Sequence, residues 1–421
     1  MQRTGKHSDL ADEVITRCQR LARFSDDEGS TRRTFLSPSI GECHREISRW
    51  MEPFGAQVRV DAAGNFRGFY PGEQSSSPRL ILGSHLDTVP NAGAYDGTLG
   101  VVLAITLLQA LEGRKLPFGI EVVGFSEEEG VRFGAPFIGS RALVGRLDDE
   151  FLNRQDEQGI SVRKAIQEFG LNPEEISRAC IDADTLGYIE FHIEQGPVLE
   201  ELGRPLGVVE AIAGQSRVEF TFVGRANHAG TTPMHLRYDA MAAAAEWIGA
   251  VERATKAVPG AVGTVGKIEA KPGATNVIAG MVHLTLDVRH RSDEIRTEIV
   301  SELIRKAEKI SERRGLTLRH RVLLCQQAVP MDGFLIKEID LAIRRAGCVP
   351  HRMVSGAGHD AMILAEKVPA AMVFLRTPGG ISHDPAESVI AEDVDKAIEC
   401  GLHLLDQLAA SPVFQKRKNR A

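Results

Sequence analysis

The chain has 421 residues, of which 43% are hydrophobic and 25% charged, values typical of a soluble protein with two or three domains. Fifty Lys and Arg residues against 57 Asp and Glu residues give a formal net charge of -7, which argues against a dedicated nucleic-acid binder or anionic-membrane binder. The 41 glycines and the aromatic content of only 5% favour a layered α/β protein over a fibrous or disordered chain.

The sequence also predicts a cytoplasmic location. The longest apolar run, about residues 99–111, is too short to cross a bilayer and is interrupted by Thr106 and Gln109. The first residues, MQRTGKHSDLADE, lack the apolar stretch of a secretory signal. Because the six cysteines are scattered without a CxxC pair, we expect free thiols in a reducing compartment, with neither a disulfide framework nor a cysteine-ligated metal.

The N-terminal half indicates helices followed by an α/β arrangement. Apolar positions at helical spacing extend from Asp9 to about Phe54. The segments after them read as a strand-turn-strand stretch (57–69), a βαβ unit (79–84, 97–111, 120–125), a mostly helical polar insertion (143–180) and an alternating strand (188–195). The alternation places Glu190, His192 and Glu194 on one face of the last strand, and three polar groups on one face need a reason.

From about residue 211 to 326 the order of elements changes. Strands are predicted at 217–223, 262–270, 281–289 and 316–324, and helices at 239–254 and 293–313. This βαββαβ order is that of the ferredoxin-like fold. An α/β pattern then resumes with a helix (333–346), a strand (371–375) and a helix (392–408), and a solvated basic tail is expected at 415–420. We therefore predict a discontinuous α/β domain, 1–211 plus 327–421, with an inserted domain, 212–326.

The stretch GSHLDTVPNAGAYDG, residues 83–97, is the most informative. His85 and Asp87 are two apart at a strand end and so face the same way, which suits a metal-binding imidazole oriented by a carboxylate. Asp96 follows in a loop that opens a helix, where open α/β sheets place their active sites. The stretch alone equally supports a simple His–Asp hydrogen bond and a helix-capping Asp96.

Three adjacent carboxylates, Glu127, Glu128 and Glu129, follow the strand 120–125. They repel one another, and a divalent metal would absorb the charge while one carboxylate ligates and its neighbour acts as general base. In isolation a solvated acidic turn is the better interpretation.

His192 and His383 supply two further imidazoles, although a single histidine is more often structural or exposed than a ligand. Every candidate lies at or just after an apolar strand, and together they offer three imidazoles and several carboxylates. This set suits divalent Zn, Mn, Co or Ni, and a shared carboxylate would allow two ions.

Six ordered motifs carry a family resemblance. They are GSHLDTVPNAGAYDGTLG from Gly83, FSEEEGVRFGAPFIGSRAL from Phe125, HIEQGPVLE from His192, GRANHAGTTPM from Gly224, SGAGHDAM from Ser355 and GGISHDPAE from Gly379. The sequence resembles the hydantoinase/carbamoylase branch of the dinuclear-metal aminoacylase and carboxypeptidase-type hydrolases, which includes allantoate amidohydrolases and N-carbamoyl-L-amino-acid hydrolases. The resemblance extends from about Leu10 to Leu408.

The resemblance implies a metal centre of defined composition. Asp96 bridges two divalent ions, Zn or Mn with Co or Ni as alternatives; His85 and His192 bind one ion, and Glu128 and His383 bind the other. It further implies that Glu127 is the general base and that Asp87 orients His85. Asp384, where relatives often have a neutral residue, adds a negative charge near the site.

The resemblance also implies a substrate site. Arg289 grips a substrate carboxylate with Asn276 and Gln195 adding hydrogen bonds, His228 donates to the transition-state oxyanion across a dimer, and Gly358 and His359 complete the pocket. The expected fold is thus an α/β metal domain with a central mixed sheet flanked by helices, carrying an inserted ferredoxin-like lid and dimerisation domain.

The expected activity is hydrolysis of a linear ureido group on a carboxylate-bearing small molecule, with release of ammonia and carbon dioxide. Allantoate, an intermediate of purine and ureide catabolism, is the favoured substrate; N-carbamoyl-L-amino-acid hydrolase and beta-ureidopropionase are the alternatives. A metal-binding or carboxylate-binding protein without catalysis is the alternative from a different functional class. A homodimer is expected, without nucleic-acid or membrane partners.

Overall fold

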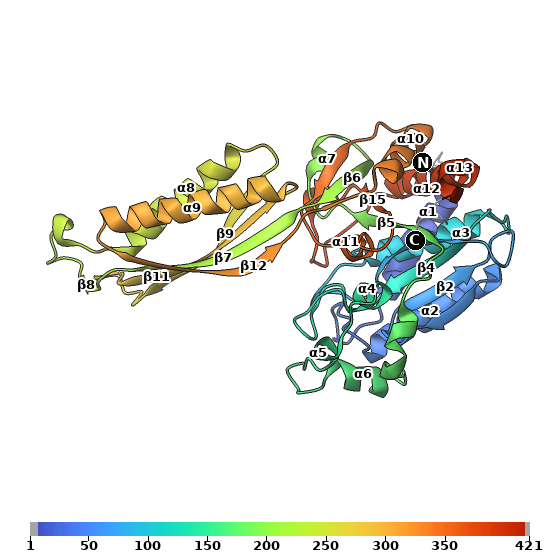
Figure 1. Ribbon diagram of the computed structural model, residues 1–421, viewed down its shortest axis with the longest axis horizontal. Helices are drawn as coiled ribbons and strands as arrows, with labels where there is room; N and C mark the ends of the chain where they lie inside the picture. The colour runs from blue at the N-terminus through green and yellow to red at the C-terminus, as the bar shows by residue number, and fades with distance from the viewer. Residues whose placement is uncertain (1–6, 417–421) are drawn as a thin grey trace. The chain divides into compact units, whose positions relative to one another are not determined.

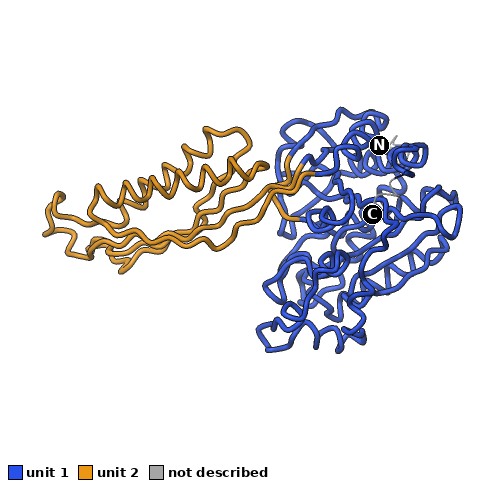
Figure 2. Tube along the Cα trace, in the orientation of Figure 1, with its two compact units in different colours: residues 1–210, 331–353, 359–421 blue, residues 211–330, 354–358 orange. Residues whose placement is uncertain are grey.

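The computed structural model describes residues 7–416, which form two compact units. Unit 1 contains the described residues up to Glu210, Met331–Met353 and those from His359 on; unit 2 contains Ala211–Pro330 and Val354–Gly358 (Figure 2). Residues 417–420 of the expected basic tail lie outside the described residues. Within the described part of the chain, none of the helices has the length and apolar content that a bilayer crossing needs.

The largest sheet has nine strands in the order β1-β2-β4-β3-β5-β15-β6-β13, with β14 paired to β6. Its strands are β1 (Gln57–Val60), β2 (Phe66–Tyr70), β3 (Arg79–His85), β4 (Gly119–Phe125), β5 (Thr185–Ile193), β6 (Leu206–Ile212), β13 (Val329–Pro330), β14 (Arg352–Ser355) and β15 (Ala370–Leu375). The central strands β4, β3, β5 and β15 are mutually parallel, whereas β2 and β6 are antiparallel to their neighbours β4 and β15. The sheet is therefore mixed, as predicted.

Helices pack against this sheet and against each other (Figure 1). The α-helices of unit 1 are α1 (Ser8–Leu21), α2 (Pro38–Met51), α3 (Thr98–Ala110), α4 (Ile138–Leu143), α5 (Asp149–Leu152), α6 (Val162–Glu168), α7 (Val198–Glu201), α10 (Gly333–Arg345), α11 (Asp360–Leu364), α12 (Ala391–Ala410) and α13 (Pro412–Gln415); short 3₁₀ helices are η1 (Glu52–Phe54), η2 (Pro173–Ala179) and η4 (Pro378–Gly380). Every side chain from Thr98 to Leu108 is buried, because α3 packs on β3, β4 and β5 and is covered by α1 and α12.

Two regions of unit 1 differ from the predicted elements. The helical period at 9–54 divides into α1 and α2, separated by an irregular segment, residues 22–37. The insertion at 143–180 forms only short helices, whose buried residues such as Val162 and Ile166 make an apolar cluster with Phe35 and Phe133. This cluster lies beside the acidic turn that follows β4, because Glu127 accepts a hydrogen bond from the Phe35 N–H.

Unit 2 contains a four-stranded antiparallel sheet in the order β12-β7-β11-β9, with two helices packed on it (Figure 1). Its elements are β7 (Gly214–Val223), β8 (Asn227–His228), η3 (Met234–Leu236), α8 (Ala240–Lys256), β9 (Val262–Lys271), β10 (Val277–Ile278), β11 (Met281–His290), α9 (Asp293–Arg313) and β12 (Thr317–Gln326). Alternate β11 side chains, from Val282 to Val288, are buried in a core with Trp247 of α8. The long elements follow the order βαββαβ, and β8 pairs with β10 outside the main sheet.

Candidate metal centre

The candidate site residues of unit 1 gather at the carboxyl ends of the parallel strands. His85 ends β3, the acidic turn 126–129 follows β4, His192 is the penultimate residue of β5, and His383 lies in a loop after β15. Parallel neighbours end at the same edge of a sheet, so these four segments meet there. Among the described residues, four groups of close potential ligands occur, and all of them lie in this region.

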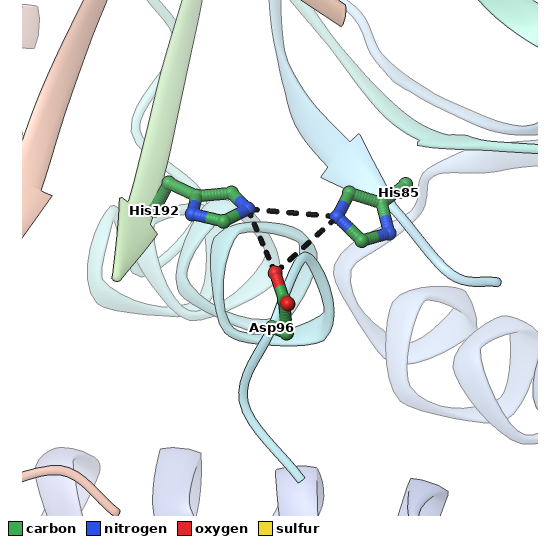
Figure 3. Close-up of side chains that lie close together, drawn as sticks. All are labelled: His85, Asp96 and His192. Atoms are coloured by element: carbon green, nitrogen blue, oxygen red, sulfur yellow. Dashed lines mark hydrogen bonds and ion pairs between the residues drawn. The ribbon is translucent and has the colours of Figure 1, made fainter. Parts of the chain in front are cut away.

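His85, His192 and Asp96 form the first group (Figure 3). The Nε2 atoms of the two histidines are 3.5 Å apart, and they lie 3.6 Å and 3.2 Å, respectively, from Oδ1 of Asp96. Each ring has its other nitrogen, Nδ1, close to a backbone carbonyl: 2.9 Å from that of Asp87 for His85, and 2.8 Å from that of Ile193 for His192. Because a carbonyl can only accept, each Nδ1 carries a proton. When the rings are neutral, the state in which histidine binds a metal, both Nε2 lone pairs face a carboxylate oxygen.

In that neutral state three acceptors converge without a donor between them. Oδ1 of Asp96 is buried and has no hydrogen-bond partner, although such buried oxygens are nearly always satisfied. Burial raises the pKa of Asp96, but the three neighbouring histidines outweigh this effect and hold the pKa well below the usual range. Two imidazoles and a carboxylate oxygen around one point fit a divalent cation such as Zn²⁺ or Mn²⁺.

The backbone permits this approach only because residue 97 is glycine. Gly97 has a φ of 63°, and a Cβ added there would lie 2.4 Å from the His85 ring. A side chain at this position would displace His85, so the Asp96-Gly97 pair fixes both the ligand loop and the start of α3.

Asp96, Glu129 and His383 form the second group. Nε2 of His383 lies 3.2 Å from Oδ2 of Asp96 and 3.4 Å from Oε1 of Glu129. Hydrogen bonds to these two carboxylates raise the pKa of His383 to about 10. The two oxygens of Asp96 thus face different groups, the geometry of a carboxylate shared between two cations.

The predicted partner of His383 was Glu128, and the structure places Glu129 there instead. Glu128 belongs to a group with His85 and Glu129, and it is 7% exposed. Burial raises the pKa of Glu128 well above its usual range, with the charges of Glu129 and Asp87 adding to the effect. Glu128 thus shares a group with one residue of each metal group, His85 and Glu129, and not with His383.

Glu127, the predicted general base, has its carboxylate occupied by the backbone. Its Oε1 accepts the N–H of Arg132 at 2.6 Å and of Phe133 at 3.3 Å, and its Oε2 accepts the N–H of Phe35 at 3.0 Å. Glu127 is fully buried and is in none of the four ligand groups found among residues 7–416. The role of base does not fit this geometry, because three backbone N–H donors occupy the carboxylate, which secures the turn.

Asp87 contacts both His85 and the acidic turn. Its carbonyl meets Nδ1 of His85, while its carboxylate accepts the N–H of Glu128 at 2.9 Å and of Glu129 at 3.0 Å. The Asp87 carbonyl is the closer partner of His85, with Oδ1 of Asp87 3.8 Å from the same Nδ1. The Asp87 side chain also positions the two glutamates.

The other polar groups of β5 have separate contacts. Glu190 accepts hydrogen bonds from Ser84 Oγ and from the Ala361 N–H that opens α11, and the Glu194 carboxylate accepts two N–H groups at the start of α7. Since β5 ends at Ile193, Glu194 caps a helix and does not share a strand face with His192. His359 is buried, with its ring 4.5 Å from that of His192 between centroids.

Gln195 reaches the metal groups directly. Its Nε2 donates to Oδ2 of Asp96 at 3.0 Å and lies 3.4 Å from Nε2 of His383. Gln195, Glu127 and His383 have φ values of 59°, 52° and 58°, a left-handed conformation that is costly for residues with a side chain. Three such residues around one centre are typical of a functional site.

The remaining predicted substrate residues belong to unit 2. His228 is exposed in β8, and the Gly230 N–H donates to its Nδ1 at 3.1 Å, so the neutral ring carries its proton on Nε2 and presents a donor. Asn276 precedes β10, and its carbonyl accepts the Ala229 N–H. The structure thus brings His228 and Asn276 together on one small sheet.

Arg289 lies elsewhere in unit 2, on β11. Its Nε and Nη2 donate to the two oxygens of Asp287 at 2.9 Å and 3.1 Å, and its Nη1 donates to the Gly356 carbonyl at 2.6 Å. Gly358 is the last residue of unit 2, next to His359 of unit 1.

Sequence reasoning missed Glu129, Ser382 and Glu387 as site residues. Glu129 was one of three adjacent carboxylates for which only two roles were foreseen, and Ser382 and Glu387 stand in the motif GGISHDPAE without an assigned role. Ser382 Oγ donates to Oδ2 of Asp96 at 3.2 Å, and Glu387 accepts the N–H groups of Tyr95 and Asp96. Asp384 is exposed and accepts the Ala386 N–H, so its carboxylate shapes the turn of this loop.

Comparisons with known proteins agree with the motifs. Residues 81–407 match the family described as Peptidase family M20/M25/M40. The chain is 39% identical to allantoate deiminase of Arabidopsis thaliana, over 95% of this chain and 82% of that protein, and 39% identical to N-carbamoyl-L-amino acid amidohydrolase of Geobacillus stearothermophilus, over 86% and 90%.

A solved structure shows the same fold along nearly the whole chain. An amidase of the hydantoinase/carbamoylase family from Burkholderia multivorans aligns with a TM-score of 0.90 at 30% identity, covering 96% of this chain and 98% of that one. The predicted family resemblance is confirmed: this chain belongs to Peptidase family M20/M25/M40.

Proposed function

We propose that the protein is a metal-dependent amidohydrolase that cleaves the linear ureido C–N bond of a carboxylate-bearing small molecule, with allantoate as the favoured substrate. One observation carries the metal dependence: the Nε2 atoms of His85 and His192 lie 3.6 Å and 3.2 Å from Oδ1 of Asp96, a buried oxygen that has no hydrogen-bond partner. The substrate class is supported by the relatives, which are named for allantoate and for N-carbamoyl-L-amino acids.

Two divalent ions, Zn or Mn in the first instance and Co or Ni as alternatives, would occupy the two groups. His85 and His192 would hold one ion, Glu129 and His383 the other, and Asp96 both. When bound, such a pair lowers the pKa of a water molecule and polarises the scissile carbonyl.

Glu128 is proposed as the general base, in place of Glu127. Glu128 lies beside both groups, whereas three backbone N–H donors occupy the carboxylate of Glu127. Glu128 would take a proton from the attacking water and return it to the departing nitrogen. One water molecule is consumed, and allantoate yields ureidoglycine, ammonia and carbon dioxide.

The substrate carboxylate is assigned to Arg289. Within the described residues, Asp287 and Gly356 engage three of the five N–H donors of its guanidinium, which leaves the end of the fork for a bidentate carboxylate. Asn276 and Gln195 would add hydrogen bonds, and the Nε2 donor of His228 would stabilise the oxyanion. Gly358 and His359 would complete the pocket.

The second candidate activity is hydrolysis of N-carbamoyl-L-amino acids or of N-carbamoyl-β-alanine. The observation that favours it is that the chain is as similar to the carbamoylase of Geobacillus stearothermophilus as to the Arabidopsis deiminase, at 39% identity to each. The substrates share a carboxylate and a ureido carbon. Allantoate and the N-carbamoyl-L-amino acids differ in the group on the α-carbon, whereas N-carbamoyl-β-alanine carries its ureido nitrogen on the β-carbon.

The experiment is ammonia release by the zinc-reconstituted or manganese-reconstituted protein from allantoate, several N-carbamoyl-L-amino acids and N-carbamoyl-β-alanine. We expect the highest kcat/KM for allantoate. A higher value for a carbamoyl compound would transfer the assignment to the second candidate. No ammonia from any compound by metal-loaded protein would leave a binding protein without catalysis and refute the proposed hydrolysis.

A further inference from the structure

We propose that Glu387 is a positioning residue that fastens the loop of His383 to the loop of Asp96, and so assembles the second metal group before a metal binds. The inference rests on the proposed metal dependence. Neither the expected ligand set nor the expected substrate site includes Glu387.

The contacts of Glu387 span two distant parts of unit 1. Its Oε1 accepts the N–H of Tyr95 at 2.7 Å and the N–H of Asp96 at 2.9 Å, across 291 residues of sequence in the latter case. Its Oε2 lies 3.4 Å from the Oγ of Ser382, which also donates to Oδ2 of Asp96. Glu387 is 5% exposed, so these bonds are shielded from water.

The second group needs the contacts of Glu387 because its histidine, His383, lies on an exposed loop. His383 lies in a stretch, 381–390, that forms neither helix nor strand; its side chain is 49% exposed, and its φ of 58° is unfavourable. By contrast, His85 and His192 are buried on strands of the sheet. The position of His383 therefore depends on what its loop is tied to.

The loops that Glu387 connects are closely packed, so they have little freedom to move relative to each other. A Cβ added at Gly93 would lie 2.5 Å from the Cβ of Glu387, so the two loops approach as closely as glycine allows. Asp96 has a second anchor in α3, since the Thr98 N–H donates to the Asp96 carbonyl at 2.6 Å. Loss of Glu387 should therefore release His383 more than Asp96.

To connect the two loops, the side chain at position 387 needs to form hydrogen bonds, but it does not need a negative charge. A glutamine at 387 could accept both N–H groups with its amide oxygen and donate to Ser382 with its amide nitrogen. Alanine would leave two buried N–H groups unsatisfied and the loops untied. The variant E387Q removes only the negative charge, whereas E387A removes both the charge and the hydrogen bonds that connect the loops.

The test uses metal binding and amide exchange, neither of which depends on turnover. We expect wild-type protein and E387Q to bind two zinc ions per chain, and E387A to bind the first normally and the second about 10- to 100-fold more weakly, the range usual for residues that support ligands. In metal-free E387A, amide hydrogens at Tyr95 and Asp96 should exchange faster than in wild type. Should E387A fail to fold, E387D carries the same expectation, because its oxygens are withdrawn by one methylene.

D332A is the matched control. Asp332 also accepts two backbone N–H groups, those of Phe334 and Leu335, but at the start of α10. D332A should lose stability and keep both zinc ions. Unchanged affinity for both ions in E387A, or equal weakening in E387Q and E387A, would overturn the inference, whereas wild-type protein that binds fewer than two zinc ions would contradict the proposed metal centre instead.

Discussion

Glu127 has left-handed backbone angles, and this conformation determines which carboxylates of the acidic turn lie next to the proposed metal-binding histidines. With a φ of 52°, Glu127 directs its side chain to the backbone of residues 35, 132 and 133, and the following two glutamates are held by the Asp87 carboxylate. The family resemblance implied that a metal ligand and a base belong in this turn. The sequence could not show which glutamates have these roles. The positions of the glutamates depend on the φ angle of Glu127, and that angle depends on a contact with Phe35, which is far away in the sequence.

His44 of α2 gives a pH-dependent prediction away from the metal centre. It is buried near Phe66 and Phe169, and burial together with the charge of Arg45 lowers its pKa to about 4. Between pH 6.5 and 4 the unfolded chain binds a proton that the folded protein excludes, so the free energy of unfolding falls as the pH falls. The loss amounts to about 3 kcal/mol at most.

The variant H44F should lack this contribution. Urea unfolding of the metal-free proteins at pH 7 and pH 4.5 would measure it, and wild type should lose more stability than H44F between the two. Equal losses would show that His44 does not titrate in this range.

Among the elements, the strands and the polar residues at their ends were the features that the sequence predicted best. The apolar runs at β3, β4 and β15 and the alternation at β5 predicted four strands, and the polar residues at or after their ends do converge at one edge. The seven-residue β6 was missed, as were shorter elements such as β14 and α11, whose few residues show no period of their own and are fixed by tertiary contacts. The irregular segment between α1 and α2 was missed for the same reason.

Arg33 fixes that irregular segment to the ligand loops. Its buried guanidinium donates to the carbonyls of Leu86 and Leu21 and to the hydroxyl of Thr98, all within 3.0 Å. Replacement by methionine would leave these acceptors buried and unsatisfied, so R33M should lower the free energy of unfolding by roughly 3 kcal/mol or more.

Denaturant unfolding of R33M beside R163A tests this. Arg163 pairs with two exposed carboxylates, Asp149 and Glu174, so R163A should change stability by less than about 1 kcal/mol. A loss in R33M no larger than in R163A would refute the role of Arg33.

At the scale of the whole molecule, the chain divides into two units with separate cores, and the candidate residues divide with them. The metal groups belong to unit 1, and His228, Asn276 and Arg289 belong to unit 2. The βαββαβ order of unit 2 could be predicted from alternating strands and an Ala-rich helix. The tasks proposed for it, those of lid and dimerisation domain, come from family resemblance.

We propose a homodimer in which His228 serves the metal centre of the partner subunit. Mixing two inactive variants, H228A and E128Q, tests this by complementation. In a mixed dimer, one site would combine an intact base with an intact His228, so random exchange should restore about one quarter of wild-type activity. No recovery after confirmed subunit exchange, or a fully active monomer in light scattering, would contradict the proposal.

The central claim is that Glu128 moves the proton while Glu129 holds a metal, and one comparison of E128Q with E129Q and E127Q tests it. Ammonia release from allantoate and bound zinc would be measured on the same samples. E128Q should keep both ions and lose activity by about 100-fold or more, E129Q should lose the second ion, and E127Q should be less stable yet active when folded. Wild-type turnover in E128Q, or loss of turnover with full zinc content in folded E127Q, would contradict the account.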